Sequence, residues 1–408
     1  MSESNQTGAP QCARFDDFDL QDPSFRRDPG PLWRQMRENC PVAHTSLHGG
    51  GWMLSRYADI TEVALDPGTF SSRAGEVTGP IPAEGRELKL PPVNTDPPDH
   101  AAQRKLLMPF FSKQAVEELE PVARSAARHL VTRILGMDGD VDAVEHFART
   151  VPVVVTTHML GLPTEDQEQF RRWTLQMLAD GAEDYQARGE AVSAIRRYFA
   201  DRLATSVVEG APGIIPFLRA RQAVDPSLTD ETALGMAFLM LIAGIDTTWS
   251  ALGASLWHLA HHPGDRRLLA ESPELIPAAV EELLRVYAPV TIGRVVTRDV
   301  EIGGRLLRAG DRVVLPWAAA NRDPERHDHP DNVVLGPDRV RHLAFGVGIH
   351  RCLGAGLAQM ELRVALEEWL ARIPEFEPTA GEVPWSAGNT RGPETLPLRI
   401  PGAAVGGR

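Results

Sequence analysis

Apolar residues recur at three- and four-residue spacing through much of residues 112–262, and charged residues occupy the positions between them. In the stretch VEELEPVARSAARHLVTRIL this spacing gathers the apolar side chains on one helical face. Shorter alternating segments occur in VVTRDVEIGGRLLRAGDRVVL, where Gly303-Gly304 and Ala309-Gly310 stand at positions suited to hairpin turns. The pattern predicts a mainly α-helical protein with minor antiparallel β-sheets.

The longest helix is predicted over residues 227–262. Ser227 can cap its first turn, with Asp230 three residues later, and Pro263-Gly264 stops it. A rise of about 1.5 Å per residue makes this helix roughly 50 Å long. Its middle, ALGMAFLMLIAGI, is apolar on every side, which is typical of a helix buried inside a protein. Such a helix can form one wall of an internal pocket.

One domain is expected over residues 1–408, because no internal repeat, low-complexity tract or Ser/Gly-rich linker divides the sequence. The polar N-terminus lacks a basic start followed by an apolar stretch, so no secretory signal is predicted. The longest apolar run, Ala233 to Ile245, is interrupted by glycines and is too short to span a bilayer. A cytoplasmic protein is therefore expected, with residues 1–15 flexible.

The formal net charge is -13, with 42 Lys and Arg against 55 Asp and Glu. A surface that binds nucleic acid needs an excess of basic residues, which this composition does not supply. No nucleic-acid partner is expected, although the composition allows a local basic patch.

The three cysteines, Cys12, Cys40 and Cys352, are odd in number and far apart, which predicts neither a disulfide framework nor a zinc site of paired cysteines. Cys352 ends the glycine-bearing string FGVGIHRCLG (345–354), directly before the helical pattern AGLAQMELRVALEEWLARI. A thiolate at a helix N-terminus is stabilised by the helix dipole and by free N–H groups, which lowers its pKa. The alternative is a structural cysteine buried after a turn.

The rest of this loop suits a flat, anionic cofactor. Gly346 and Gly348 let the backbone approach such a group without a Cβ clash. Arg351 and His350 add positive charge beside the thiolate, and His350 can reach an anionic group at the cofactor edge.

The string resembles the haem-binding loop of the cytochrome P-450 superfamily, whose pattern is Phe-Gly-x-Gly-x-His-x-Cys-x-Gly. Its specified positions are filled here by Phe345, Gly346, Gly348, His350, Cys352 and Gly354. The resemblance implies the cytochrome P-450 fold, with haem b between the long central helix and the 345–354 loop. It also implies that Cys352 is the axial iron ligand, and a thiolate in that position favours cleavage of the O–O bond.

A second resemblance lies in the central helix, where AGIDTT (243–248) matches the family's oxygen-activating pattern. It implies that Asp246 and Thr247 form an acid–alcohol pair that organises water to deliver two protons. Ala243 and Gly244 are implied to face the cofactor, with Gly244 leaving room for oxygen. Taken alone, the motif also fits a structural alternative, in which the threonine bonds back to the preceding turn and the aspartate sits in water.

Two further features follow the family. Glu282 and Arg285, three residues apart on one helix face, resemble its Glu-x-x-Arg motif, which Arg339 would complete as a structural network. The two haem propionates require cationic or hydrogen-bonding partners. The resemblance nominates His100, Arg104, Arg294 and His350.

The substrate pocket is expected to be lined by a recognition loop over residues 71–98, by the central helix near Leu239 and Ala243, by residues 290–292 and by the turn near Asn389. These positions are mostly apolar or small, which favours a hydrophobic small molecule. Charged residues of the loop either face solvent or contact a polar substituent. They are Glu76, Glu84, Arg86, Glu87 and Lys89.

The resemblance implies an oxidoreductase, a monooxygenase that activates O2 and hydroxylates, epoxidises or demethylates its substrate in natural-product or xenobiotic metabolism. Three scattered cysteines cannot hold an iron–sulfur centre, and the loop glycines lack the third glycine of a dinucleotide fingerprint. Electrons are therefore expected from a separate ferredoxin or flavodoxin with its NAD(P)H-dependent reductase. A monomer is expected, with a local basic docking face of Arg104, Lys105, Lys113, Arg341 and Arg351.

Two other functions remain open from the sequence. One is a peroxide-using hydroxylase or decarboxylase of the same fold, which would need no proton relay. The other is a haem-binding sensor or scaffold without turnover. Substrate identity and the position oxidised are open as well.

Overall fold

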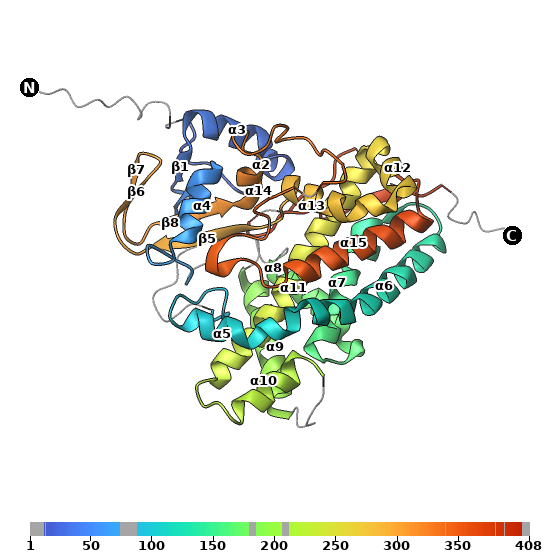
Figure 1. Cartoon of the computed structure of the whole chain (residues 1–408), viewed down its shortest axis with the longest axis horizontal. Coiled ribbons are helices and arrows are strands. Elements are labelled where there is room, and N and C mark those ends of the chain that lie inside the picture. The colour runs from blue at the N-terminus through green and yellow to red at the C-terminus, as the bar shows by residue number, and fades with distance from the viewer. Residues whose placement is uncertain are drawn as a thin grey trace, which may run out of the picture.

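The computed structural model describes residues 12, 14–73, 88–178, 185–205, 212–338, 340–379, 381–386 and 388–401. Helices make up most of the molecule, and the strands of the main sheet and of the β6–β7 pair gather at one side of it (Figure 1). The predicted mainly α-helical class with small β-sheets is confirmed.

The described α-helices are α2 (Pro23–Arg27), α3 (Gly30–Asn39), α4 (Tyr57–Leu65), α5 (Asp99–Leu107), α6 (Lys113–Leu135), α7 (Thr150–Leu160), α8 (Gln167–Leu178), α9 (Tyr185–Thr205), α10 (Ile214–Gln222), α11 (Asp230–His261), α12 (Pro263–Glu271), α13 (Ile276–Val286), α14 (Trp317–Asn321) and α15 (Ala355–Arg372). Two short helical turns bear on the site. They are η3 (Val144–Ala148) and η7 (Gly348–His350).

The main sheet has the strand order β1-β2-β8-β5-β3, in which β2 and β8 run parallel and the other pairs are antiparallel. Its strands are β1 (Val42–Thr45), β2 (Gly51–Leu54), β3 (Phe70–Ser71), β5 (Thr291–Val296) and β8 (Arg312–Pro316). A second sheet has the order β4-β10-β9. Its strands are β4 (Val141–Asp142), β9 (Glu377–Pro378) and β10 (Pro397–Arg399).

One of the two predicted hairpins forms. Gly303 and Gly304, both with positive φ, turn β6 (Val300–Ile302) back onto β7 (Arg305–Leu307). The turn at Ala309-Gly310 does not make a second hairpin, because the strand that follows it, β8, pairs with β5 and β2 instead of β7. The alternating pattern predicted the strands but did not indicate which strands pair with each other.

The long central helix is present with different ends from those predicted. Its N-cap is Thr229, whose side chain accepts a hydrogen bond from the Thr232 N–H, and the helix ends at His261 after 32 residues. Ser227 does not cap it, because its hydroxyl donates to the Asp225 carboxylate at 2.6 Å. The hydroxyl of Thr229, which directly precedes the first helical residue, therefore forms the cap.

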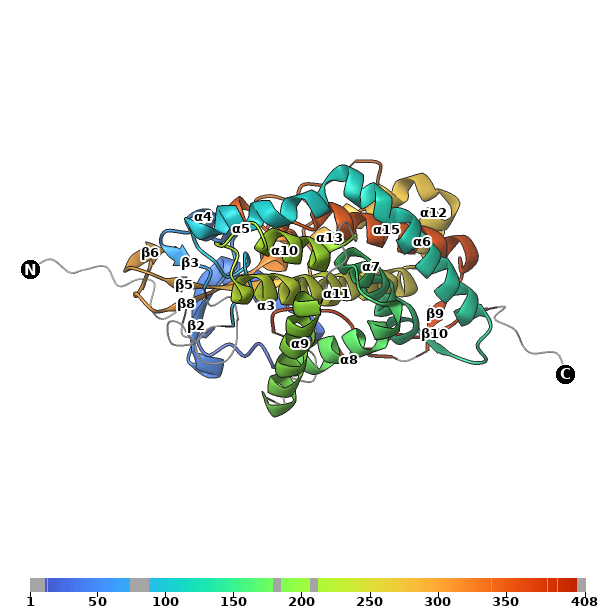
Figure 2. The ribbon, with the colours of Figure 1, turned by 90° about the horizontal axis from the view of Figure 1, so that it is seen from below.

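This helix lies in the middle of the molecule, with α5, α6 and α10 on one side and α8 and α9 on the other (Figure 2). By length and composition alone α11, which contains the apolar run Ala233 to Ile245, could cross a membrane. However, 67% of its most apolar window is buried inside the protein. Its apolar surface is covered by neighbouring helices, as expected for the core helix of a globular fold.

The apolar core has two parts, and α11 contributes to both. Leu239, Ile245 and Trp249 pack with α7, α9 and α10. Further along the same helix, Leu252 and Leu256 pack with α13, the main sheet and the second half of α15. The central helix therefore joins the two parts, and AGIDTT lies in the half that packs with the first part.

The described N-terminal residues contradict one prediction, because Cys12 and Cys40 form a disulfide across 28 residues of sequence. Cys40 lies at the C-terminal end of α3, fully buried, and the chain before α2 folds back onto it. Spacing along the chain could not reveal this pairing, since it depends on how the N-terminal segment returns to α3.

Candidate functional site

The Cys352 loop is closed by a hydrogen bond from the Cys352 N–H to the Phe345 carbonyl at 2.8 Å. Gly346 (φ 67°) and Gly348 (φ 75°) shape the loop. A Cβ on Gly348 would lie 3.0 Å from the Ala64 carbonyl oxygen, and one on Gly346 would lie 3.3 Å from the Trp317 ring. These contacts are with protein, so the glycines serve the loop's conformation and packing.

The Cys352 thiol precedes α15 by three positions, and its side chain is exposed. The surrounding protein still desolvates the thiol and raises its pKa, while the Gly354 N–H, Arg104 and Arg351 act in the opposite direction. The protein alone therefore does not lower the pKa of Cys352 as predicted, because desolvation outweighs these stabilising groups.

The middle of α11 also has side chains with accessible surface. Ala243 is exposed although it lies between the buried Leu241 and Ile245, and Thr247, one turn later, is only half-buried. Within the described part of the chain, nothing packs closely against this side of the helix. The helix after Cys352, α15, packs against α11, and its residues Leu357 and Met360 belong to the same apolar cluster as Ile245.

Two arginines and two histidines meet near the Cys352 loop, two of the four from α5, one from β5 and one from η7. They are His100, Arg104, Arg294 and His350. The rings of His100 and His350 are 4.3 Å apart. Burial, followed by the charges of Arg294, His100 and Arg104, lowers the pKa of His350 to about 3. The structure thus brings together all four residues nominated for the propionates.

The cluster suits an anion. Arg104 donates to the Arg351 carbonyl at 2.7 Å, and Arg294 donates to the Gly293 carbonyl at 2.9 Å. The Nε2 atoms of both His100 and His350 are buried without a hydrogen-bond partner among the described residues. Unpartnered donors and unneutralised positive charge are costly inside a protein, so these residues fit the two carboxylates of a haem.

Thr247 donates its hydroxyl to the Ala243 carbonyl at 2.8 Å, which is the back-bond that the sequence left as the alternative. Asp246 is 6% exposed, and burial raises its pKa to about 6. Hydrogen bonding to Thr390 and Trp249 and the charge of Arg149 partly oppose that rise. No hydrogen bond is described between Asp246 and Thr247, so the two groups are neighbours with separate partners.

Gly244 lies where α11 faces α7. A Cβ at this position would lie 2.8 Å from the Thr156 hydroxyl of α7. The missing side chain therefore lets α7 approach α11 closely. Thr156 is fully buried, and its hydroxyl has no partner among the described residues.

The Glu-x-x-Arg pair is buried and doubly hydrogen-bonded, with both Arg285–Glu282 distances at 2.8 Å. Arg285 also donates to the carbonyls of Asn321, Pro330 and Asn332. The pair therefore anchors the segment that leads toward the Cys352 loop. Arg339 lies outside the described residues, as do positions 74–87 of the 71–98 loop with Glu76, Glu84, Arg86 and Glu87.

Two segments predicted to line the pocket meet each other. The Thr291 N–H donates to the Asn389 carbonyl at 2.9 Å, and Val290 forms a β-bridge with Thr390. The sequence did not identify Thr390 or Trp249 as neighbours of Asp246. Trp249 could have been found, because it lies three residues later on the same helix, but nothing in the sequence points from Asp246 to Thr390.

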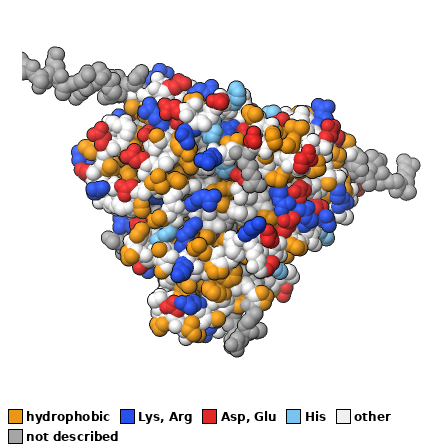
Figure 3. Space-filling view, in the orientation of Figure 1, with side chains coloured by type: hydrophobic (Ala, Val, Ile, Leu, Met, Phe, Trp, Pro, Cys, Tyr) orange, Lys and Arg blue, Asp and Glu red, His pale blue; other side chains and the backbone are white. Residues whose placement is uncertain are grey.

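Lys and Arg side chains are visible over α5 and the loop before α15, whereas basic and acidic side chains alternate over α6 and α15 (Figure 3). Of the predicted basic face, Lys105, Lys113, Arg341 and Arg351 are exposed, and Arg104 is partly buried.

Comparison with known proteins gives the same family as the Cys352 loop. Residues 212–385 match the family model for cytochrome P-450. The chain is 38% identical over 389 residues to cytochrome P-450 130 of Mycobacterium tuberculosis, covering 91% of this chain and 95% of that protein. It is 36% identical to vitamin D(3) 25-hydroxylase of Pseudonocardia autotrophica, with 89% and 91% covered.

The fold agrees with solved structures. CYP109E1 from Bacillus megaterium, crystallised in complex with testosterone, has a TM-score of 0.84 and 30% identity, with 93% of this chain and 100% of that chain covered. The identity to relatives across almost their full lengths confirms the resemblance seen in the Cys352 loop. The chain belongs to the cytochrome P-450 family of haem-containing monooxygenases.

Proposed function

We propose that this monooxygenase oxidises a hydrophobic small molecule by hydroxylation, epoxidation or demethylation, with electrons from a separate ferredoxin or flavodoxin and its NAD(P)H-dependent reductase. The observation that carries this proposal is the uncovered side of α11 at Ala243 and Thr247, adjacent to the buried acid Asp246. We also propose that the enzyme acts as a cytoplasmic monomer built from a single domain.

Cys352 would ligate the haem iron, and His100, Arg104, Arg294 and His350 would hold the propionates. Phe345, Gly346 and Gly354 would form the loop around the thiolate, with Ala243 and Gly244 on the helix opposite it. Haem bound through a thiolate supplies the activation of O2 and the transfer of one oxygen atom to substrate. Phe345 accepts from the Cys352 N–H, and this bond fixes the loop on which the thiol is carried.

Asp246 and Thr247 would deliver the protons. A carboxyl whose pKa lies near 6 can both hold and release a proton close to neutral pH. The hydroxyl of Thr247 can pass a proton through water if it exchanges its bond to the Ala243 carbonyl. The acid on the buried side of the helix and the alcohol on the uncovered side would then act in sequence.

The pocket segments support a hydrophobic substrate. Leu239 is buried in α11, and Val290 and Ile292 are partly buried apolar residues packed against the core. The loop over residues 71–98 would complete recognition. Because one relative is a vitamin D(3) hydroxylase and one solved structure contains testosterone, both compounds are reasonable first ligands for a spectral titration.

The decisive experiment is the absorption spectrum of the reduced, carbon-monoxide-bound holoenzyme. We expect the strongly red-shifted Soret band of thiolate ligation, and we expect Cys352→Ser to lose it. An unchanged spectrum in that variant would refute Cys352 as the ligand. Product formation with NAD(P)H, ferredoxin and reductase, compared with peroxide alone, separates the monooxygenase from a peroxide-using enzyme, and no product with either would favour a sensor or scaffold.

A further inference from the structure

His342, shortly before the Cys352 loop, forms a buried pair with Glu281 of α13. Their side chains are 3% and 10% exposed, and His342 Nε2 lies 3.0 Å from Glu281 Oε2. On the other side of the ring, His342 Nδ1 accepts a hydrogen bond from the Ala344 N–H at 3.1 Å. A ring nitrogen that accepts carries no proton, so the proton is on Nε2 and is donated to the carboxylate. The pair therefore holds the imidazole in one tautomer and one orientation.

The second oxygen of Glu281 reaches the other side of the same loop. Gln359, in the second turn of the helix that follows Cys352, donates to Glu281 Oε1 at 2.7 Å. The adjacent acid, Glu282, is bonded to Arg285, so the two neighbouring carboxylates of α13 have separate partners. Glu281 therefore connects the segment before the Cys352 loop to the helix after it.

Backbone hydrogen bonds carry this constraint to Cys352. Ala344 immediately precedes Phe345, whose carbonyl accepts from the Cys352 N–H at 2.8 Å. The Leu343 N–H donates to Asn321 Oδ1 at 2.6 Å, and both Leu343 and Ala344 are buried. The histidine therefore fixes the chain one residue before the carbonyl that holds the Cys352 backbone.

We propose that Glu281 and His342 are positioning residues for Cys352, because one carboxylate joins both ends of the loop to α13 and so sets the direction of the thiolate. The inference rests on the proposed role of Cys352 as the iron ligand. Hydrogen-bonded groups behind a metal ligand orient it, and their loss typically costs about 10–100-fold in metal affinity or activity. Without the pair, the loop can turn its thiol away from the iron.

The first measurement follows the red-shifted Soret band of the reduced, carbon-monoxide-bound holoenzyme. Each protein is held at the same interval below its own melting temperature. His342→Phe keeps a ring without either hydrogen bond, and Glu281→Met keeps an unbranched side chain without the carboxylate. We expect both to lose the band on the order of tenfold faster than the parent. Glu281→Gln, which retains an oxygen that can accept from His342, should stay close to the parent rate.

The second measurement is the iron–sulfur stretching vibration, recorded by resonance Raman spectroscopy on the unheated holoenzyme. It should shift in His342→Phe and in Glu281→Met. Cys12→Ser is the control for a general loss of stability, because its disulfide ties the N-terminal segment to α3, and it should leave the vibration at the parent frequency. His342→Asn, which can still accept from the Ala344 N–H, should give an intermediate shift and decides the matter if His342→Phe binds no haem.

Two results would overturn the proposal. One is an equal rate of band loss and an unmoved vibration in the parent, His342→Phe and Glu281→Met. The other is the same change in Cys12→Ser, which would assign the effect to stability. If the parent holoenzyme never shows the red-shifted band, the proposed ligand role of Cys352 fails and the inference fails with it, so the parent spectrum separates the two failures.

Discussion

At the scale of single residues, this protein places titratable groups where burial dominates their behaviour. Burial is the largest influence on Asp246, His350, Cys352 and Glu361. For an acid, burial favours the protonated form, and for an imidazole it favours the neutral form. The neighbours that oppose burial therefore decide which of these groups can change charge near neutral pH.

Thr247→Ala should keep haem and substrate binding but uncouple the reaction. The variant lacks the hydroxyl of the proposed relay, so reducing equivalents are diverted to peroxide. We expect product per NAD(P)H oxidised to fall on the order of tenfold or more. Thr247→Ser, which retains the hydroxyl, is the matched control. Unchanged coupling in the alanine variant would refute the role of this residue.

Glu361 should make stability depend on pH. It lies in α15 with 2% of its surface exposed, its Oε2 atom has no partner among the described residues, and burial raises its pKa from 4.5 to about 8. Between these values the unfolded chain has released the proton and the folded protein still holds it. The free energy of unfolding should therefore fall as pH rises through this window, by about 1.4 kcal/mol per pH unit.

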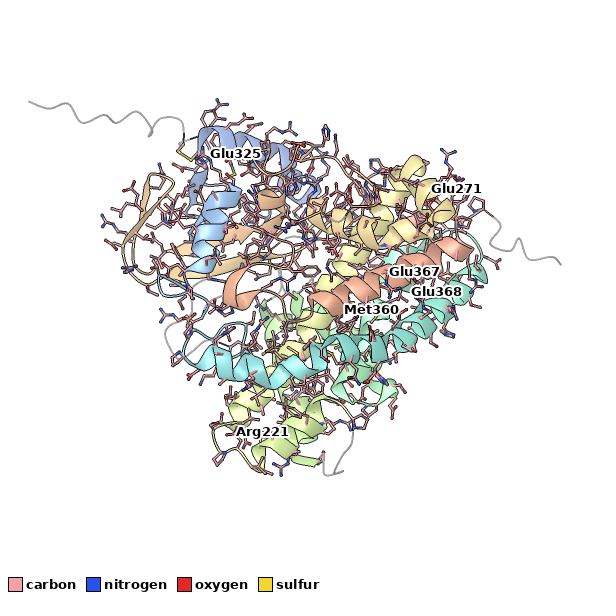
Figure 4. The ribbon with its side chains drawn as sticks, viewed as in Figure 1. Arg221, Glu271, Glu325, Met360, Glu367 and Glu368 are labelled. Carbon is pink, nitrogen blue, oxygen red and sulfur yellow. A yellow bond between two sulfur atoms is a disulfide. The ribbon has the colours of Figure 1, made fainter. Side chains whose placement is uncertain are left out.

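Glu361→Gln removes this titration and keeps the side-chain shape. We expect the variant to gain melting temperature relative to the parent at pH 8 but not at pH 4.5. Glu271→Gln is the control, since Glu271 is exposed at the end of α12 (Figure 4). Parallel pH profiles for the parent and Glu361→Gln would show that Glu361 is not protonated in the fold.

At the scale of elements, the site depends on how closely helices approach one another. Between α6 and α15 a charged network fixes the separation, with Arg124 bonded to Glu120, Glu367 and Glu368 at 2.7–2.8 Å. Glu367 and Glu368 lie where α15 faces α6 (Figure 4). Between α7 and α11 no such network is needed, because Gly244 allows direct contact with Thr156.

Gly244→Ala should push these two helices apart. The added Cβ would lie 2.8 Å from the Thr156 hydroxyl, and a threonine in a helix has few alternative rotamers. We expect a loss of stability of about 1–3 kcal/mol, seen as a lower melting temperature. Thr156→Ala in the same chain should recover part of this loss. Additive effects of the two substitutions would mean that this contact does not limit the approach of the helices.

At the scale of the whole molecule, the disulfide ties the N-terminal segment to α3. Constraint of a loop of this length is worth about 3.5 kcal/mol in the chain-entropy model, so Cys12→Ser should lower the melting temperature by a few degrees. The carbon-monoxide spectrum should be unchanged. In reducing buffer the parent and the variant should melt alike, and three free thiols in the denatured, unreduced parent would contradict the disulfide.

The family and the fold class could be predicted from sequence, because their signals are local. The helical pattern depends on spacing within each segment, and the haem loop packs its glycines, histidine and cysteine into ten consecutive positions. The Glu282–Arg285 pair is equally local, since three residues along a helix bring both side chains to one face. Each of these signals lies within a short stretch of consecutive residues.

Contacts between distant segments could be decided only by the tertiary structure. Several contacts join parts of the chain that lack a shared local pattern. They are the Cys12–Cys40 disulfide, the pairing of β8 with β5, the approach of α7 to Gly244 and the Val290–Thr390 bridge. The directions of the pKa shifts also depend on the tertiary structure, because burial is a property of the packed molecule. The sequence by itself determined which chemistry this protein carries, and the tertiary structure decided which neighbours adjust it.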